Sequence, residues 1–140
     1  MISPAQERAT RDDRATRIAA LNEPLREALT RQAATGKTTT YRDLTDRLGL
    51  KPPHTIHRLA QALEVLMEED VAAGRPMLAA LCTSKARPDL PGPGFFMKAQ
   101  SLGAFSGDPA GPEACAFHQR ELRRALSFYA PLTPFGDEAV

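Results

Sequence analysis

The sequence predicts a mainly α-helical fold with a small β-hairpin, and two patterns lead to this prediction. First, a short helical segment that opens at Thr40 is followed, after a turn, by a longer helical run from Thr55 to Ala73. Second, two apolar runs, residues 77–83 and 95–97, stand on either side of a loop rich in Pro and Gly, as the strands of a hairpin do. Together with a last helix near the C-terminus, this order predicts a winged-helix-like helix-turn-helix with an additional C-terminal helix.

Composition favours a single domain with a modest core. The chain has 140 residues, 42% of them hydrophobic, and 18 Lys and Arg stand against 17 Asp and Glu for a net charge of +1. A basic surface therefore requires segregation of charge, because the total supplies almost none. We expect a charged arm or helix over residues 1–20, one winged-helix-like domain over 21–130 and an irregular tail over 131–140.

The N-terminus is polar and charged, and no apolar run approaches the length of a membrane span. Cys82 and Cys115 are a single pair without a secretion signal, which does not predict a disulfide framework, and no Cys or His cluster has the spacing of a metal site. We therefore expect a cytoplasmic protein without a membrane partner, a metal ion or a cofactor.

The first 20 residues are Ala-rich and carry arginines at a three-residue spacing, Arg8, Arg11, Arg14 and Arg17. They are expected to form a helix with a solvated face or a loose arm, or else an arginine arm that lies along phosphates. A helix should then begin at a cap on Asn22 with Pro24 in its first turn, and should end at Gly36. Its buried stripe is Leu21, Leu25, Ala28 and Leu29.

The helix-turn-helix rests on capping and breaking residues. Thr40 and Asp43 have the spacing of a capping box, and Gly49 should end the short helix that they open. Two prolines at 52–53 forbid a helix, so the longer helix should start at His54 or Thr55 and end at Gly74. Its inward stripe recurs with helical spacing, and the stripe residues are Ile56, Leu59, Ala60, Leu63, Leu66 and Met67.

The two apolar runs should form the hairpin, or wing. Residues 77–83 suit a buried strand, and Phe95 to Met97 begin a second strand or a short helix that ends near Gly103. The last helix should run from about Glu113 to Tyr129. Its inward residues are Phe117, Leu122, Ala125, Leu126 and Tyr129, and its exposed side carries Arg120, Arg123 and Arg124.

The start of the longer helix is the first candidate site. Arg and Gln make bidentate contacts to base edges, the other side chains reach phosphates, and a helix N-terminus adds free N–H groups and partial positive charge. Lys85 and Arg87 at the tip of the wing would straddle the DNA backbone. The complete set of expected nucleic-acid contacts is Thr39, Thr40, Tyr41, Arg42, His54, Thr55, His57, Arg58, Gln61, Lys85 and Arg87.

Each of these assignments has a plainer alternative. The longer helix is equally readable as an ordinary surface helix of a structural or protein-binding winged helix, because the geometry is shared by many domains that do not bind DNA. The acidic second half of the helix, Glu64 to Asp70, would repel DNA and limit contact to the first two turns. Residues 85–94 are also readable as a plain connecting loop.

No set of residues fills the roles of a catalytic site. Cys82 lies in an apolar run and is expected to be an inert buried thiol. Cys115 and His118 stand one helical turn apart but lack a third member. Gly36-Lys37-Thr38 lacks the upstream glycine and strand of a phosphate-binding P-loop. We therefore expect no enzymatic activity.

Three segments carry a resemblance to a known family: Thr39–Thr45, then Leu48-Gly49, then Leu59–Leu63. Together they resemble the winged-helix DNA-binding domain of O6-alkylguanine alkyltransferases and alkyltransferase-like proteins, over roughly residues 36–83. The family's Pro-Cys-His-Arg nucleophile motif has no counterpart, since Cys82 falls later and is followed by Thr83-Ser84. The family's base-displacing arginine falls near His57. The resemblance implies the fold and DNA contact, but not alkyl transfer.

A looser resemblance covers the segments after the longer helix. Gly74, Pro76 and Leu78, and then Pro91-Gly92 with Gly94-Phe95-Phe96, are similar to small uncharacterised bacterial modules found beside endonuclease-like or mobile-element sequences. This resemblance implies a defence, phage or gene-transfer setting and names no reaction.

The sequence thus predicts a non-catalytic DNA-binding protein. The alternative is a protein-interaction adaptor, in which the arginines of the last helix pair with an acidic partner, or an accessory subunit of a nuclease system. Near-neutral charge and the Pro-rich loop fit the adaptor.

Overall fold

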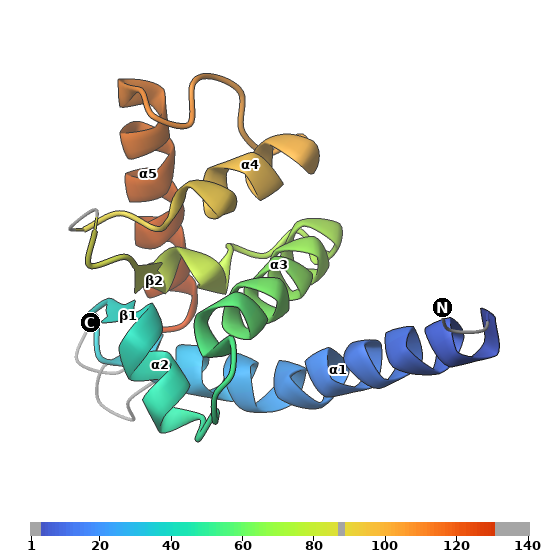
Figure 1. Cartoon of the computed structure of the whole chain (residues 1–140). Helices are drawn as coiled ribbons and strands as arrows, with labels where there is room; N and C mark the ends of the chain where they lie inside the picture. The colour runs from blue at the N-terminus through green and yellow to red at the C-terminus, as the bar shows by residue number, and fades with distance from the viewer. Residues whose placement is uncertain (1–3, 87–88, 131–140) are drawn as a thin grey trace.

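The computed structural model describes residues 4–86 and 89–130, with side chains from residue 18 onward. These residues form five α-helices, one short 3₁₀ helix and a two-stranded parallel sheet. Figure 1 shows the long N-terminal helix along one side, the helix that follows the turn packed across it, and the last two helices stacked beyond. The expected tail, residues 131–140, lies outside the described residues.

The first helix, α1 (Pro4–Ala34), is longer than expected. We expected a cap at Asn22, but the helix passes through Asn22 and Pro24 without a break. The Asn22 side chain instead donates to the Glu69 carboxylate, 3.0 Å away, on a neighbouring helix. The Ala- and Arg-rich residues before it are good helix formers, so the helix extends through them. Its N-terminal part projects past the other helices in Figure 1.

The next two helices begin and end where the sequence predicts. The side chain of Thr40 caps α2 (Tyr41–Arg47) by accepting from the N–H of Asp43 at 3.2 Å. Gly49 follows with a φ of 67°, the left-handed conformation that favours glycine at a helix end. The longer helix, α3 (Thr55–Ala73), starts after His54 and ends at Gly74, whose φ is 71°.

The connection between α2 and α3 is longer than expected. Residues 48–54 separate them, whereas a helix-turn-helix joins its helices by three or four residues. Two prolines at 52–53, joined by a cis peptide bond, hold this part of the chain out of helix. The helix order is as predicted, but the connection is longer than the short turn that defines a helix-turn-helix.

The expected β-hairpin is also wrong. Residues 78–81 form a short 3₁₀ helix, η1 (Leu78–Leu81), and only β2 (Cys82–Thr83) is extended. That strand pairs in parallel with β1 (Thr39–Thr40), so the partner of the apolar run lies before α2, not after the loop. Every residue of η1 is buried, and η1 packs against α1, α3 and α5, which explains why the run is apolar without being a strand.

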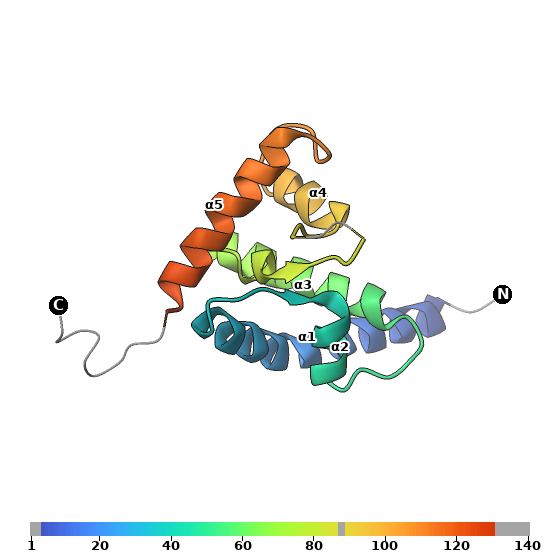
Figure 2. The ribbon, with the colours of Figure 1, turned by 90° about the vertical axis from the view of Figure 1, so that its left-hand side faces the viewer.

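The second apolar run is helical. It lies in α4 (Pro93–Ser101). Of the two expected alternatives, a second strand or a short helix that ends near Gly103, the structure has the helix. Pro93 starts the helix in the position that proline favours, and the buried residues Phe95, Phe96 and Ala99 share one face. The last helix, α5 (Pro112–Phe128), matches the expected bounds closely. Figure 2 shows α4 and α5 packed together above α3.

The core gathers one face of each helix around η1. Two of our expectations fail there. Ile56, placed on the inward stripe of α3, is 45% exposed. Asp70, counted with the acidic second half of the helix that would repel DNA, is fully buried. It follows Leu59, Leu63 and Leu66 at helical spacing and so points inward.

Candidate functional site

The exposed start of α3 is the centre of the candidate site. His54 precedes the helix with a φ of 59° and makes no side-chain cap, and no acidic residue lies in the first turn. The free N–H groups of a helix N-terminus and its partial positive charge are therefore open to an anion. His54 and His57 are exposed beside it. An exposed cation, Arg42, lies at the start of α2.

The acidic half of α3 is neutralised more than the sequence suggested. Glu68 pairs with Lys98 of α4, and Glu69 pairs with Arg26 of α1 at 2.8 Å. Asp70 is buried against Arg26 and Arg75. The repulsion that we expected between this half of α3 and DNA is reduced accordingly, because three of its carboxylates already have cationic partners. Glu64 is half-buried in the groove described below.

Several expected contact residues have other partners. Thr39 is only 8% exposed, and its carbonyl accepts from the hydroxyl of Thr83, so its side chain has little access to a ligand. Tyr41 is half-buried, and its hydroxyl accepts from the N–H of Gly92 at 3.0 Å. The hydroxyl of Thr40 caps α2. Thr55 and Gln61 are half-buried on α3.

Arg58 is turned back against its own chain. Its guanidinium donates to the backbone carbonyl of Lys51 in the α2–α3 connection, and its Nε is enclosed without a hydrogen-bond partner. This position does not direct the fork of the guanidinium toward a base edge. We therefore leave Arg58 out of the DNA contacts proposed below.

The expected wing is a loop. The N–H of Ser84 donates to the carbonyl of Leu90 at 2.7 Å and closes the segment between them. Lys85 is exposed on this loop, and Arg87 lies outside the described residues. The loop can bring Lys85 to an anionic surface, but its described residues form no paired strands like those of a wing.

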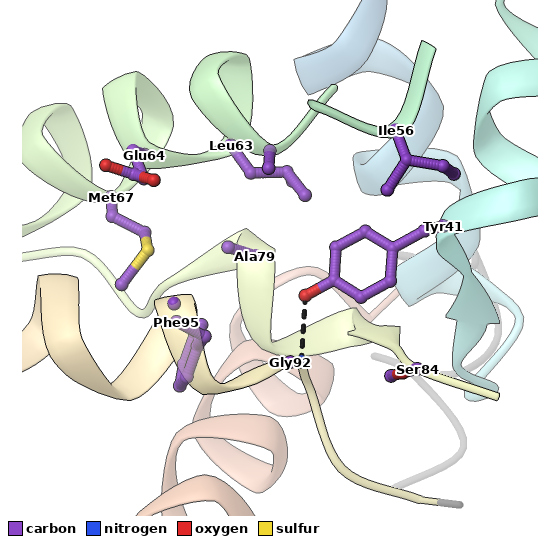
Figure 3. A pocket seen from close by; sticks show the side chains of 11 residues that line it. Tyr41, Ile56, Leu63, Glu64, Met67, Ala79, Ser84, Gly92 and Phe95 are labelled. Atoms are coloured by element: carbon purple, nitrogen blue, oxygen red, sulfur yellow. Dashed lines mark hydrogen bonds between the residues drawn. The ribbon is translucent and has the colours of Figure 1, made fainter. Parts of the chain in front are cut away.

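An apolar groove runs along α3 beside this site (Figure 3). Its volume is about 270 Å³, and Tyr41 and Ile56 lie at one end, with Met67 and Phe95 toward the other. Burial raises the pKa of the Tyr41 hydroxyl to about 12, so this group is a neutral phenol at physiological pH. Figure 3 shows its hydroxyl directed at Gly92, at the start of α4.

The arginines of α5 are exposed, as predicted. Arg124 pairs with Glu121 at 2.6 Å, whereas Arg120 and Arg123 border a shallow depression with Phe128. This basic surface gives the chain a second candidate for contact with an acidic partner.

The thiols and imidazoles do not form a catalytic group. Cys82 is fully buried, and burial raises the pKa of its thiol far above the ordinary range. Cys115 is exposed, while His118, one turn later, is buried with its Nε2 donating to the carbonyl of Ala80 at 2.8 Å. Among the described residues, no cluster of His, Cys, Asp and Glu has the arrangement of a metal site.

The described helices also lack a segment with the length and apolar character needed to cross a bilayer. A scan against protein-family models, a search of curated proteins and a search of solved structures each found no match to this chain. The resemblance to the alkyltransferase DNA-binding domain therefore stays a prediction.

Proposed function

We propose that this protein binds duplex DNA without catalysing a reaction, through the exposed start of α3. The observation that carries the proposal is the segregation of charge along α3. Its N-terminal turn is open, free of acidic residues and flanked by exposed imidazoles, while Glu68, Glu69 and Asp70 at the other end pair with cations. An anion is therefore attracted to one end of the helix.

The proposed contacts are the accessible members of the predicted set. Arg42 follows Tyr41 and His57 follows Ile56, two residues that line the groove of Figure 3, and both side chains are exposed. His54 and Thr55 border the open helix end, and Lys85 extends the surface along the loop. With few cations, the complex would be weak and its salt dependence modest, because both affinity and salt slope grow with the number of phosphate contacts.

The test is fluorescence anisotropy of labelled duplex DNA at several salt concentrations. Replacing Arg42 and His57 together with Ala should weaken binding about tenfold or more and flatten the salt dependence. The matched control replaces Arg120 and Arg123 of α5, which removes at least as much positive charge elsewhere and should change affinity little. Equal losses in the two variants, or no saturable binding by the unaltered protein, would refute the proposed surface.

One observation favours the protein-interaction adaptor as a second candidate. Ile56 is 45% exposed at the edge of an apolar groove, where burial against a partner would be favourable. Ile56→Lys separates the two functions, since an added cation should preserve or strengthen DNA binding but should disrupt an apolar protein interface. Loss of DNA binding in Ile56→Lys, with folding intact, would count against the phosphate contacts proposed here.

A further inference from the structure

A second groove lies on the opposite flank of α3, between its first turns, α1 and the α2–α3 connection. Its volume of about 350 Å³ falls within the range of small-molecule sites. The wall is mainly apolar, and none of its lining residues with a described side chain is Asp or Glu. The residues that matter most are Ile18, Leu21, Leu48, Leu50, Arg58 and Gln61.

Arg58 is the unusual member of this lining. Its Nη2 donates to the Lys51 carbonyl, but its Nε is enclosed and has no hydrogen-bond partner. Leaving a buried N–H without a hydrogen-bond partner is destabilising, and more so for a charged group. Among the described side chains, Arg58 Nε is the only buried nitrogen or oxygen without a hydrogen-bond partner. Every other such atom has its hydrogen bond within the chain.

We propose that this groove binds a small amphipathic carboxylate. The carboxylate would accept hydrogen bonds from the guanidinium of Arg58 and the side-chain amide of Gln61, whose donors suit an oxygen anion. The apolar body would lie against Ile18, Leu21, Leu48 and Leu50. The groove thus combines apolar walls with a guanidinium that has no carboxylate partner among the described residues. Its positive charge favours a ligand with a negatively charged group.

This site is independent of the proposed DNA surface. Arg58 and Gln61 are not among the DNA contacts that we propose, and the groove of Figure 3 lies along other residues of α3. Binding of the carboxylate is therefore a further activity, and the outcome of the DNA experiment does not affect it.

The test uses octanoate as the probe and octanol as its uncharged match. The Nε–Hε resonance of Arg58, assigned by its absence in Arg58→Met, reports directly on the atom that lacks a partner. Octanoate should shift this resonance to saturation, and octanol should bind at least about tenfold more weakly, because it cannot pair with the cation. Equal affinities, or no saturating shift with octanoate, would overturn the proposal.

Gln61→Glu provides the matched variant. It keeps the side-chain shape but adds a negative charge to the groove, so octanoate affinity should fall about tenfold or more while octanol affinity stays unchanged. Gln119→Glu makes the same substitution at an exposed position of α5 and should leave both affinities unaltered. Unchanged octanoate affinity in Gln61→Glu would overturn the proposal. So would an Arg58 shift that follows protein concentration without octanoate, since a second copy would then occupy the groove.

Discussion

Asp70 accepts hydrogen bonds from three separate parts of the chain. One carboxylate oxygen takes Arg26 Nη1 of α1 at 2.9 Å and Arg75 Nε at 3.3 Å, and the other takes the N–H of Leu78 at the start of η1 at 3.1 Å. The carboxylate is fully buried, so these partners replace the water that it loses. This one side chain thereby links α1, the residue after α3 and the start of η1.

We expect Asp70→Asn to lower the free energy of unfolding by about 3 kcal/mol, because it leaves two guanidinium groups without their buried counter-charge. Glu69→Gln is the control, since Glu69 pairs with the same Arg26 but is 43% exposed. It should cost less than about 1 kcal/mol. Urea denaturation compares the two, and similar losses would contradict a special role for the buried carboxylate.

At the scale of elements, the backbone conformation of a glycine decides where α3 ends. Gly74 ends α3 in the left-handed conformation, and the N–H of Arg75 then donates to the carbonyl of Asp70 at 2.8 Å. No atom would obstruct a Cβ at Gly74, so glycine is needed there only for its backbone conformation. Gly94, in the first turn of α4, is equally unobstructed, and its φ is not positive.

These two glycines give a matched prediction. Gly74→Ala should destabilise the protein by about 1 kcal/mol, because alanine is strained at positive φ. Gly94→Ala should be neutral or stabilising by up to about 1 kcal/mol, because it reduces the freedom of the unfolded chain. Thermal unfolding followed by circular dichroism measures both, and a reversed order would show that backbone conformation is not the controlling factor.

At the scale of the whole molecule, η1 joins the N-terminal helices to the α4–α5 pair. It packs against α1, α3 and α5, and the buried His118 of α5 donates to its Ala80 carbonyl. Phe95 stacks edge-on with this imidazole at a centroid distance of 6.2 Å. Burial lowers the pKa of His118, against the opposing effects of the Ala80 hydrogen bond and the charge of Asp89.

This pKa shift makes stability depend on pH. The unfolded imidazole binds a proton near pH 6.5, whereas the folded one resists it, so stability should fall as pH drops below about 6.5. The slope for one group cannot exceed about 1.4 kcal/mol per pH unit. Denaturant unfolding at about pH 7 and pH 5 should show a smaller difference in His118→Gln than in the unaltered protein.

The exposed His57 supplies the control for this measurement. His57→Gln removes one imidazole from the surface and leaves the buried imidazole of His118 in place. If His118→Gln and His57→Gln have the same effect on the loss of stability between the two pH values, the buried imidazole is not its source.

Local signals in the sequence determined the order and ends of α2, α3 and α5, because caps, breakers and helical spacing act within a few residues. The same spacing marks Asp70 as inward, although its acidic neighbours conceal the signal. The tertiary structure alone decided that residues 78–81 form a 3₁₀ helix and that β2 pairs in parallel with β1. Periodicity cannot distinguish a buried strand from a buried helical turn, and strand pairing joins residues that are distant in the chain. Arg58 follows the same rule: the residue type predicted contact with a base, but packing against α1 and the α2–α3 connection decided which groove it faces.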